Sequence, residues 1–401
     1  MTHVAGRGRW VIVALVFCAI MLNYVDRQIL ALLKPTLEAE FGWSDQDYGN
    51  MASAFQFAAA VAFLGTGWFI DRVGLRWGFA LGVAVWSLAG MAHAFAATVA
   101  GFIGARVVLG AAESIGTPAS VKSAATYFGP RDRSIALGIG NTAPNIGAIV
   151  TPVAVPAIAV AFGWRAAFLI AGALGLVWVV AWILVKVPPV TVDAGEPAPV
   201  PWMRLLRDRR TLAIALAKIL SDQVWFFMLS WLPDLFHRLF GLPQGTVGLP
   251  VALVYALAAC GALTGGWLPT RLVARGWSLD RARKGTLLLY ALLILPVPTV
   301  LSLQSPWTAA LVLGLGLFAH QGFSTNVFGL TTDVMPARSV GSTVGIAAFC
   351  GNMGSIGMIQ LSAWSLSHGW GYAPMLTICA FSYLAALGCI QLLIPKITAA
   401  A

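Results

Sequence analysis

The chain has 401 residues, of which 59% are hydrophobic and only 10% are charged, and its mean hydropathy is +0.82. Soluble domains carry about 25% charged residues, so this composition excludes a soluble globular protein and predicts one that crosses a membrane many times. The net charge of +10 does not indicate a nucleic-acid partner, because the basic residues follow the predicted membrane topology.

Twelve apolar runs are long enough to span a membrane, which requires about 20 mostly apolar residues. They begin near residues 10, 48, 76, 98, 134, 164, 211, 246, 284, 306, 339 and 371. The first run is not a cleavable signal peptide, because it is too long, contains the pair Asp26-Arg27 and has no small-residue cleavage site. The sequence therefore predicts an all-α polytopic membrane protein with twelve transmembrane helices.

The lysine and arginine residues are distributed unequally between the two sides of the membrane. If the N-terminus is cytoplasmic, the inside loops and ends hold 18 of the 25 basic residues, the outside loops hold 3, and 4 lie within or at the ends of spans. This is the positive-inside pattern. We therefore expect a multi-pass protein of the inner (cytoplasmic) membrane, surrounded by lipid, with both termini cytoplasmic.

The chain is predicted to divide into two similar halves. Residues 188–210 are Pro-rich and then basic, which indicates a cytoplasmic linker between an N-terminal six-helix bundle, 1–187, and a C-terminal one, 211–401. The segment 129–152 is echoed by 335–358, an offset of about 206 residues. Such a repeat predicts two bundles related by a pseudo-twofold axis.

Four charged residues fall inside apolar runs. Asp26 and Arg27 lie in the first run, and Arg106 and Glu113 lie in the fourth. Ions in a membrane segment are energetically expensive, so they indicate a functional site. Arg106 and Glu113 are seven residues apart, which places them on one helix face. Gly116 and Pro118 are expected to break this helix directly after Glu113.

Two arginines and two acids favour a site for an organic anion and protons. The planar guanidinium of arginine binds a carboxylate through two parallel hydrogen bonds. A buried carboxylate beside an arginine can bind and release a proton. The alternative is that Arg106 and Glu113 form a purely structural salt bridge.

The segment 67–78, "GWFIDRVGLRWG", resembles the signature loop of the major facilitator superfamily. The matching residues, which we interpret as a gating loop, are Gly67, Asp71, Arg72, Gly74 and Arg76. In that superfamily the loop holds one gating state. The equivalent segment of the second half, 265–276, has Thr270 where the acid would stand, so we expect the latch in the first half alone.

Three further motifs make the resemblance more specific. "NYVDRQIL" at 23–30, R-x-x-x-G-x-x-E at 106–113 and "SWLPDLF" at 230–236 are similar to the anion:cation symporter family. The likeness is greatest to bacterial hexuronate (glucuronate/galacturonate) transporters, then to galactonate and glucarate permeases, and more distantly to vesicular glutamate transporters. It implies the major facilitator fold, with helices 1, 4, 7 and 10 around a central cavity, and proton-driven uptake of organic anions.

The family resemblance also implies roles for individual residues. The acids that match Asp26 and Glu113 are implicated in proton coupling. The arginine that matches Arg27 is implicated in holding the substrate carboxylate, and the tyrosine that matches Tyr24 in contacting the sugar acid. Two departures leave the sugar acid open: alanines replace a tyrosine on helix 2, and Phe323 stands where hexuronate carriers often have tryptophan.

Other polar residues in the apolar runs complete the predicted site, because a hydroxyl-rich ligand needs several donors and acceptors. Each is equally consistent with an interhelical hydrogen bond. Besides Tyr24 and Arg27, the candidates for substrate binding are Arg106, Gln56, Asn141, Asn145, Gln321, Ser324, Asn326, Asn352 and Ser355. We interpret His320 as a packing residue, and Lys218 and Asp222 as a partly exposed ion pair.

The sequence thus predicts a secondary active transporter that takes up a hexuronate or related sugar acid with protons, by rocker-switch alternating access. We expect no cofactor, no metal and a functional monomer. The alternative is an exporter or exchanger of an aromatic or dicarboxylic acid. An enzyme is disfavoured because no catalytic motif occurs, and a sensor because the last run ends near Ile394, which leaves no room for an appended domain.

Overall fold

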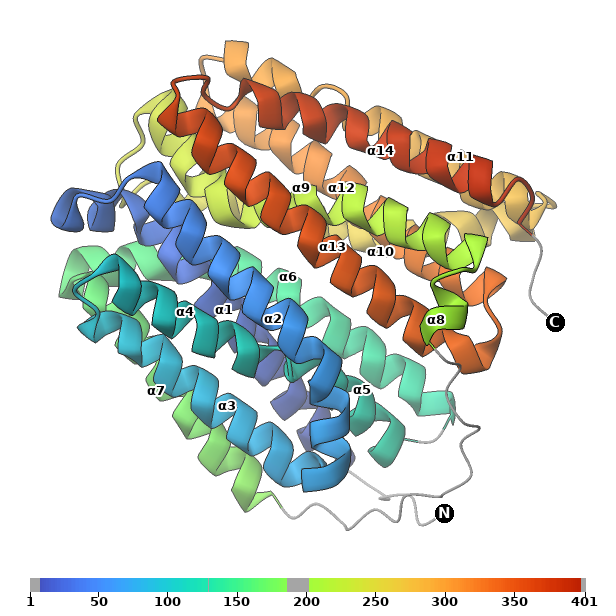
Figure 1. Cartoon of the computed structure of the whole chain (residues 1–401), viewed down its shortest axis with the longest axis horizontal. Helices are drawn as coiled ribbons and strands as arrows, with labels where there is room; N and C mark the ends of the chain where they lie inside the picture. The colour runs from blue at the N-terminus through green and yellow to red at the C-terminus, as the bar shows by residue number, and fades with distance from the viewer. Residues whose placement is uncertain (1–7, 129, 186–201, 398–401) are drawn as a thin grey trace. The chain divides into compact units, whose positions relative to one another are not determined.

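A computed structural model of the chain describes residues 8–128, 130–185 and 202–397, and all regular secondary structure in these ranges is helical. The elements are α1 (Gly8–Phe41), α2 (Asp45–Val73), α3 (Leu75–Ala92), η1 (His93–Phe95), α4 (Val99–Glu113), α5 (Gly116–Tyr127), α6 (Pro130–Phe162), α7 (Trp164–Leu184), α8 (Trp202–Leu205), α9 (Arg209–Phe240), α10 (Gly248–Ala274), α11 (Leu279–Leu293), η2 (Val297–Ser302), α12 (Pro306–Val334), α13 (Ala337–Ser367) and α14 (Ala373–Leu393) (Figure 1). The all-α prediction is confirmed.

Eleven helical segments among the described residues have the length and hydropathy of a membrane span. The remaining predicted span corresponds to α12, which is 29 residues long. Its centre contains His320, Gln321, Ser324 and Asn326, which lower its hydropathy. Most of the predicted linker lies outside the described residues; the structure describes α8 and the start of α9 there.

The helices form two compact units. The first is drawn from Met1–Asp193 and Leu242–Ala252, and the second from Ala194–Gly241 and Leu253–Ala401. Within the first unit α1 packs on α6 and α7, and α3 packs on α4 and α7. Within the second unit α9 packs on α13 and α14, and α11 packs on α12 and α14. These four helix pairs therefore correspond between the two units.

Local sequence explains where several helices begin and end. Ser44 caps α2 through a capping box with Asp47, which satisfies backbone N–H groups at the helix start. Gly74 has φ = 87°, a conformation that residues with a Cβ rarely adopt, and it separates α2 from α3 inside the predicted gating loop.

The predicted break in the fourth span is confirmed. The helix α4 ends at Glu113, and α5 begins at Gly116. Pro118 has no N–H, and its ring clashes with the carbonyl four residues earlier in a continuous helix. This break places Glu113 at a helix end.

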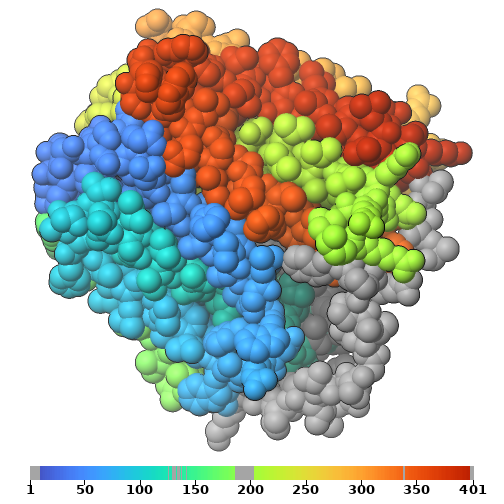
Figure 2. Space-filling model, viewed as in Figure 1, coloured from blue at the N-terminus to red at the C-terminus, as the bar shows by residue number. Residues whose placement is uncertain are grey.

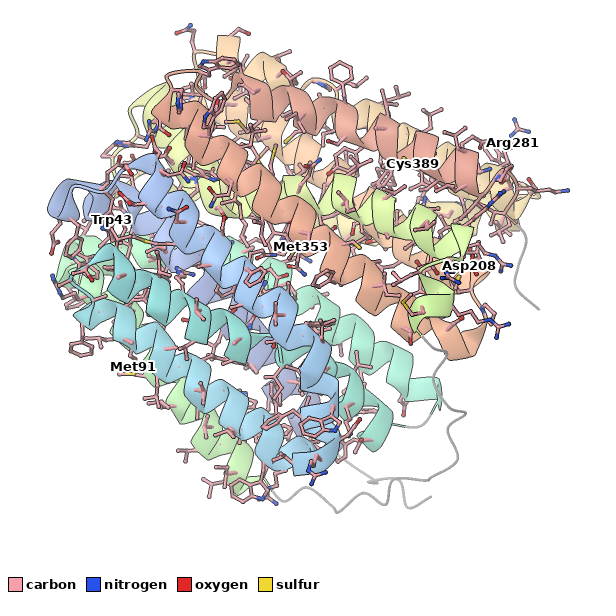
Figure 3. The ribbon with its side chains drawn as sticks, viewed as in Figure 1. Trp43, Met91, Asp208, Arg281, Met353 and Cys389 are labelled. Carbon is pink, nitrogen blue, oxygen red and sulfur yellow. The ribbon has the colours of Figure 1, made fainter. Side chains whose placement is uncertain are left out.

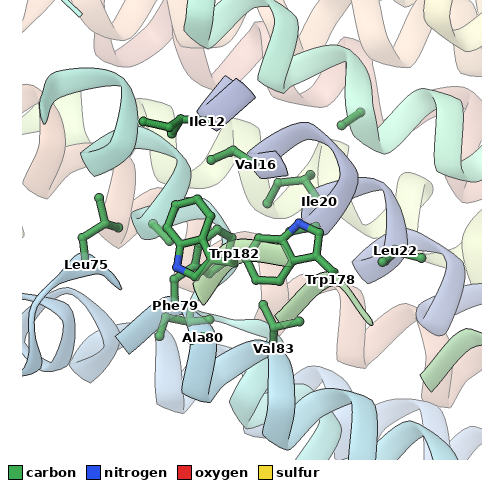
Figure 4. Close-up of a cluster of buried hydrophobic side chains, with 14 of the residues drawn as sticks. Ile12, Val16, Ile20, Leu22, Leu75, Phe79, Ala80, Val83, Trp178 and Trp182 are labelled. Atoms are coloured by element: carbon green, nitrogen blue, oxygen red, sulfur yellow. The ribbon is translucent and has the colours of Figure 1, made fainter. Parts of the chain in front are cut away.

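Aromatic side chains form much of the buried core of the first unit (Figure 4). Trp178 and Trp182 of α7 stack with ring centroids 5.3 Å apart, and Phe79 of α3 contacts both edge-on. The indole N–H of Trp178 donates to the carbonyl of Leu15, over 2.7 Å. These large rings join α3 and α7 to α1 while their polar atoms stay hydrogen-bonded.

Near its N-terminal end, α4 packs against the connection between α1 and α2. Trp43, in the connection between α1 and α2, packs edge-on against Phe102 of α4 with ring centroids 4.6 Å apart (Figure 3). The side chains of α3 and α4 meet along the face of the first unit shown in Figure 2. The helix that contains Arg106 and Glu113 is therefore packed on several sides.

Candidate functional site

An ion pair joins α1 to α4 inside the first unit. Nε of Arg27 lies 2.9 Å from Oε2 of Glu113, and the two side chains are 15% and 0% exposed. One turn earlier on α1, Nδ2 of Asn23 donates to the backbone carbonyl of Glu113 over 3.3 Å. Glu113 is thus the fully buried partner, and Arg27 is the one with access to solvent or ligand.

Asp26 lies on a different side of α1 from its neighbour Arg27. A Cβ placed on Gly90 of α3 would be 3.5 Å from Oδ1 of Asp26, so the carboxylate rests against α3. Asp26 is buried and within electrostatic range of Arg106 and Glu113. Successive residues on a helix diverge by about 100°, so two adjacent charges can serve two different surroundings.

Phe55 of α2 contacts both arginines, and sequence reasoning missed it. The guanidinium carbons of Arg27 and Arg106 lie 5.2 Å and 5.6 Å from the centre of its ring, and Arg27 is also 5.2 Å from the ring of Tyr24. Such cation–π contacts stabilise buried guanidinium groups. The only signal in the sequence is an aromatic residue beside Gln56.

Gly110 explains the glycine in the R-x-x-x-G-x-x-E motif. A Cβ at Gly110 would collide with the backbone carbonyl of Phe55, so only glycine allows α4 to approach α2 this closely. Arg106, four residues earlier, lies on the same face and thereby reaches the ring of Phe55. The glycine is a packing requirement for placing the charges.

The other candidates in the first unit lie on α2 and α6. Gln56 is buried on α2. Asn145 is buried on α6, and its Oδ1 has no hydrogen-bond partner among the described residues. The side chain of Asn141 lies outside what the structure describes. The acceptor of Asn145 is therefore unsatisfied within the described part of the chain.

In the second unit Asn326 belongs to a network between α11 and α12. Its amide donates to Oγ1 of Thr286 and to the carbonyl of Arg283, and its Oδ1 accepts from Arg283 over 3.0 Å. Arg283 also forms an ion pair with Asp333, 2.7 Å away. These bonds satisfy the amide of Asn326 inside the unit.

Lys218 and Asp222 form the predicted ion pair on α9, with Nζ and Oδ1 2.6 Å apart, but at 7% and 14% exposure it is more buried than expected. Nζ of Lys218 also donates to Ser324 over 3.2 Å and lies above the ring of Phe328. These neighbours cover the lysine, which is one of the buried charges of the second unit.

Four further polar residues of the second unit lie on α12 and α13. Ser355 and Asn352 donate to carbonyls one turn earlier on α13. Gln321 is partly buried on α12. His320 bonds to the hydroxyl of Tyr383 over 2.7 Å and stacks on Trp225, which is the packing role expected of it.

The predicted gating loop is bonded to two other helices of the first unit. Asp71 forms an ion pair with Lys122 of α5, a partner that sequence reasoning missed. The guanidinium of Arg76 donates to the carbonyl of Ile183, and Trp182 donates to the carbonyl of Arg76. Arg72 lies over the ring of Trp68, one turn earlier on α2. Gly67 belongs to the same helix.

Within the described ranges, no cluster of three or more His, Cys, Asp and Glu side chains has the geometry to hold a metal ion. The polar groups present are guanidinium, ammonium and amide donors, which suit an organic anion, and carboxylates, which suit protons.

Known proteins match the chain over most of its length. The sequence profile of the Major Facilitator Superfamily matches residues 16–359. The D-galactonate transporter of Escherichia coli O6:H1 is 26% identical, and the match covers 96% of this chain and 96% of that protein. The hexuronate transporter of Escherichia coli K12 is 28% identical, over 94% and 92%.

A solved structure has the same fold. The crystal structure of a bacterial homolog of the human lysosomal transporter Spinster, in an inward-facing and occupied conformation, superimposes with a TM-score of 0.75. The match covers 98% of this chain and 96% of that chain, at 17% sequence identity. At this identity the likeness concerns the fold.

Proposed function

Because the chain belongs to the Major Facilitator Superfamily and is a transporter of that type, we propose that it carries a hexuronate or related sugar acid together with protons. The observation on which the proposal rests is the buried ion pair between Arg27 and Glu113, beside Asp26 and Arg106. Relatives named as D-galactonate and hexuronate transporters support this substrate class.

Competition for Arg27 couples the proton to the anion. Removing one partner of a buried ion pair costs about 3–5 kcal/mol, because the other charge is left uncompensated. Protonation of Glu113 neutralises it and allows Arg27 to bind the substrate carboxylate through its planar fork. Loss of that proton restores the ion pair and releases the anion. The rings of Tyr24 and Phe55 contact the guanidinium of Arg27 through cation–π interactions.

Asp26 supplies a second proton site. It is buried, faces α3 and does not share Arg27 with Glu113. Arg106, also buried, is the positive charge within range of both acids, and we place it with the proton sites more than with the substrate. The second site is thus separated from the substrate carboxylate.

Neutral groups bind the sugar hydroxyls. Asn145, whose acceptor is unsatisfied among the described residues, is the leading candidate, and Asn326 and Ser355 are weaker because they are bonded within their own unit. The further candidates are Gln56, Asn141, Gln321, Ser324 and Asn352.

We place the protein in the inner membrane with cytoplasmic termini, working as a monomer that alternates access by rocking of its two units. The Asp71–Lys122 ion pair of the gating loop then stabilises one gating state.

A dicarboxylic acid is the second candidate substrate. The observation in its favour is the buried ammonium of Lys218 in the second unit, which binds Asp222 in this structure and would have to exchange it for a second carboxylate. Galactarate and galacturonate differ by one carboxylate. Competition between them for uptake therefore separates the two candidates.

Proteoliposomes with an imposed pH gradient and labelled glucuronate or galacturonate test the proposal. Glu113→Gln is expected to abolish uphill accumulation and to retain counterflow, because glutamine cannot carry the proton. The matched control is Asp234→Asn, a buried ion-paired acid on α9, which is expected to accumulate substrate normally. Uphill accumulation by Glu113→Gln overturns the coupling assignment.

A further inference from the structure

His93 is a buried histidine at the end of α3 for which neither the sequence motifs nor the proposed mechanism gives a role. Its Nδ1 lies 2.8 Å from the carbonyl of Ala89 and 3.2 Å from that of Gly90. A carbonyl only accepts hydrogen bonds, so Nδ1 carries the hydrogen, and Nε2 of the neutral ring is an acceptor. Within the described part of the chain, this buried Nε2 has no hydrogen-bond partner.

Aromatic neighbours fix the orientation of the His93 ring. It stacks on Phe168 of α7 with centroids 5.0 Å apart and an angle of 6° between the planes. Phe102 of α4 contacts it edge-on at 5.9 Å. The ring is therefore packed on two sides and bonded on a third, and Nε2 is its one remaining polar atom.

Arg106 lies on the same side of α4 as the ring that His93 contacts. Phe102 and Arg106 are four residues apart, one above the other on one helix face. His93 and Arg106 are within electrostatic range of each other. Nε and Nη2 of Arg106 are buried and also have no hydrogen-bond partner among the described residues. A buried acceptor and two buried donors, each unsatisfied, thus occupy one region of the first unit, an arrangement that proteins rarely leave unbonded.

Two other acceptors lie near Arg106: Oε1 of Glu113, which is buried and has no hydrogen-bond partner among the described residues, and the hydroxyl of Tyr48. Nε2 of His93 is an uncharged acceptor without a partner there, in the ring that contacts Phe102. Glu113 uses Oε2 for Arg27, and the ring of Phe55 packs against the guanidinium of Arg106. The titratable and charged groups that face Arg106 from α1, α2, η1 and its own helix are Asp26, Arg27, Tyr48, His93 and Glu113.

Asp26 contacts the C-terminal end of α3, which is the end that His93 follows. Its carboxylate rests against Gly90, whose carbonyl also bonds to the His93 ring. An arginine that is linked to His93 is therefore kept near Asp26 and away from the Arg27–Glu113 pair.

We propose that His93 positions Arg106: Nε2 accepts a hydrogen bond from one buried water that the guanidinium also binds, and this bridge holds Arg106 as the counter-charge of Asp26. The proposal deepens the function proposed above, since it depends on Asp26 as a proton site. His93 itself contacts neither substrate nor the carried proton. Its contribution is to keep Arg106 from joining Glu113 or binding the substrate carboxylate.

Two substitutions of His93 distinguish the roles of the two ring nitrogen atoms. Asn at position 93 retains a donor near Nδ1 for the carbonyl of Ala89 and lacks any atom at Nε2. Gln is long enough to place an acceptor oxygen near Nε2. In proteoliposomes we expect His93→Asn to reduce pH-gradient-driven accumulation about tenfold, the value of one hydrogen bond to a charged group, with an unchanged KM for counterflow. His93→Gln is expected to retain accumulation.

Equal loss of accumulation and counterflow in both variants would indicate a purely structural role and overturn the proposal, as would wild-type coupling in His93→Asn. A double-mutant cycle with Arg106→Gln, read as Tm in detergent, is independent of transport and of the substrate. We expect the two substitutions to be non-additive. Additive effects overturn the His93–Arg106 link, whereas a wild-type protein that fails to accumulate sugar acids overturns the proposed function alone.

Discussion

Arg27 and Glu113 are bonded at 2.9 Å across two helices, while Asp26, the sequence neighbour of Arg27, rests against Gly90 on a third. One turn of α1 thus supplies two acid–base environments, one for the pair to which we assign anion binding and one for the separate proton site that we propose. This division follows from the 100° between adjacent helix positions and from the close packing of α4 on α2.

Replacing Gly110 by alanine is expected to destabilise the protein. The new methyl group collides with the backbone carbonyl of Phe55, and overpacking of this kind costs about 1–3 kcal/mol. The measurement is Tm in detergent. Gly104→Ala on the same helix is the control, because nothing lies within 4 Å of a Cβ there, and it is expected to leave Tm unchanged or raise it slightly. Equal Tm values for both variants contradict the packing role of Gly110.

Phe55→Leu is expected to weaken substrate binding while the protein stays folded. Leucine preserves apolar volume but removes the ring that both arginines contact, and each cation–π contact contributes about 0.5–2 kcal/mol. We predict a rise in the KM for uptake of about threefold or more. Phe55→Tyr keeps the ring and serves as the control. A KM for Phe55→Leu that matches the wild type refutes the role of this ring.

The Asp71–Lys122 pair is expected to act on transport rate rather than on stability. Both groups are partly exposed, at 70% and 28%, and such pairs contribute at most about 1 kcal/mol. Lys122→Asp alone brings two like charges together and should lower the maximal rate of uptake without changing KM. The charge exchange Asp71→Lys with Lys122→Asp should restore the rate. Failure of the exchange to restore it argues against a gating role for the pair.

Asn145→Ala is expected to affect substrate binding, whereas Asn326→Ala is expected to affect stability. Asn145 has a buried acceptor that is unsatisfied among the described residues, so its loss should raise the KM for sugar acids and leave Tm nearly unchanged. Asn326 joins Arg283 to Thr286, so its loss should lower Tm and leave KM nearly unchanged. Parallel measurements of Tm and KM on both variants decide this, and the reverse pattern would exchange the two assignments.

The sequence predicts those features that depend on local chemistry. Hydropathy is a property of each segment, so eleven of the spans among the described residues could be recognised from residue type, whereas the polar centre of α12 lowers its hydropathy. Buried charges such as Asp26 and Glu113 are conspicuous because ions are costly in a membrane. The break before α5 follows from the backbone restrictions of proline.

The partners of these residues could not be predicted, because they depend on how helices approach and rotate against each other. Arg27, rather than Arg106, pairs with Glu113. Phe55 and His93 looked like ordinary residues of apolar segments, and only the ring contact of Phe55 with Arg106 and the contact of His93 with Phe102 of the same helix distinguish them. Asn326 looked like a ligand contact, and its bonds to Arg283 and Thr286 became apparent only once α11 and α12 were placed side by side.

The central claim is that Glu113 and the substrate carboxylate compete for Arg27, and affinity at alkaline pH tests it most directly. Glucuronate binding to the purified wild type and to Glu113→Gln is measured by calorimetry at a pH where the acids are ionised. We predict that Glu113→Gln binds about tenfold or more tightly than the wild type, because the substitution releases Arg27 from its ion pair. Equal or weaker binding by Glu113→Gln would contradict the claim.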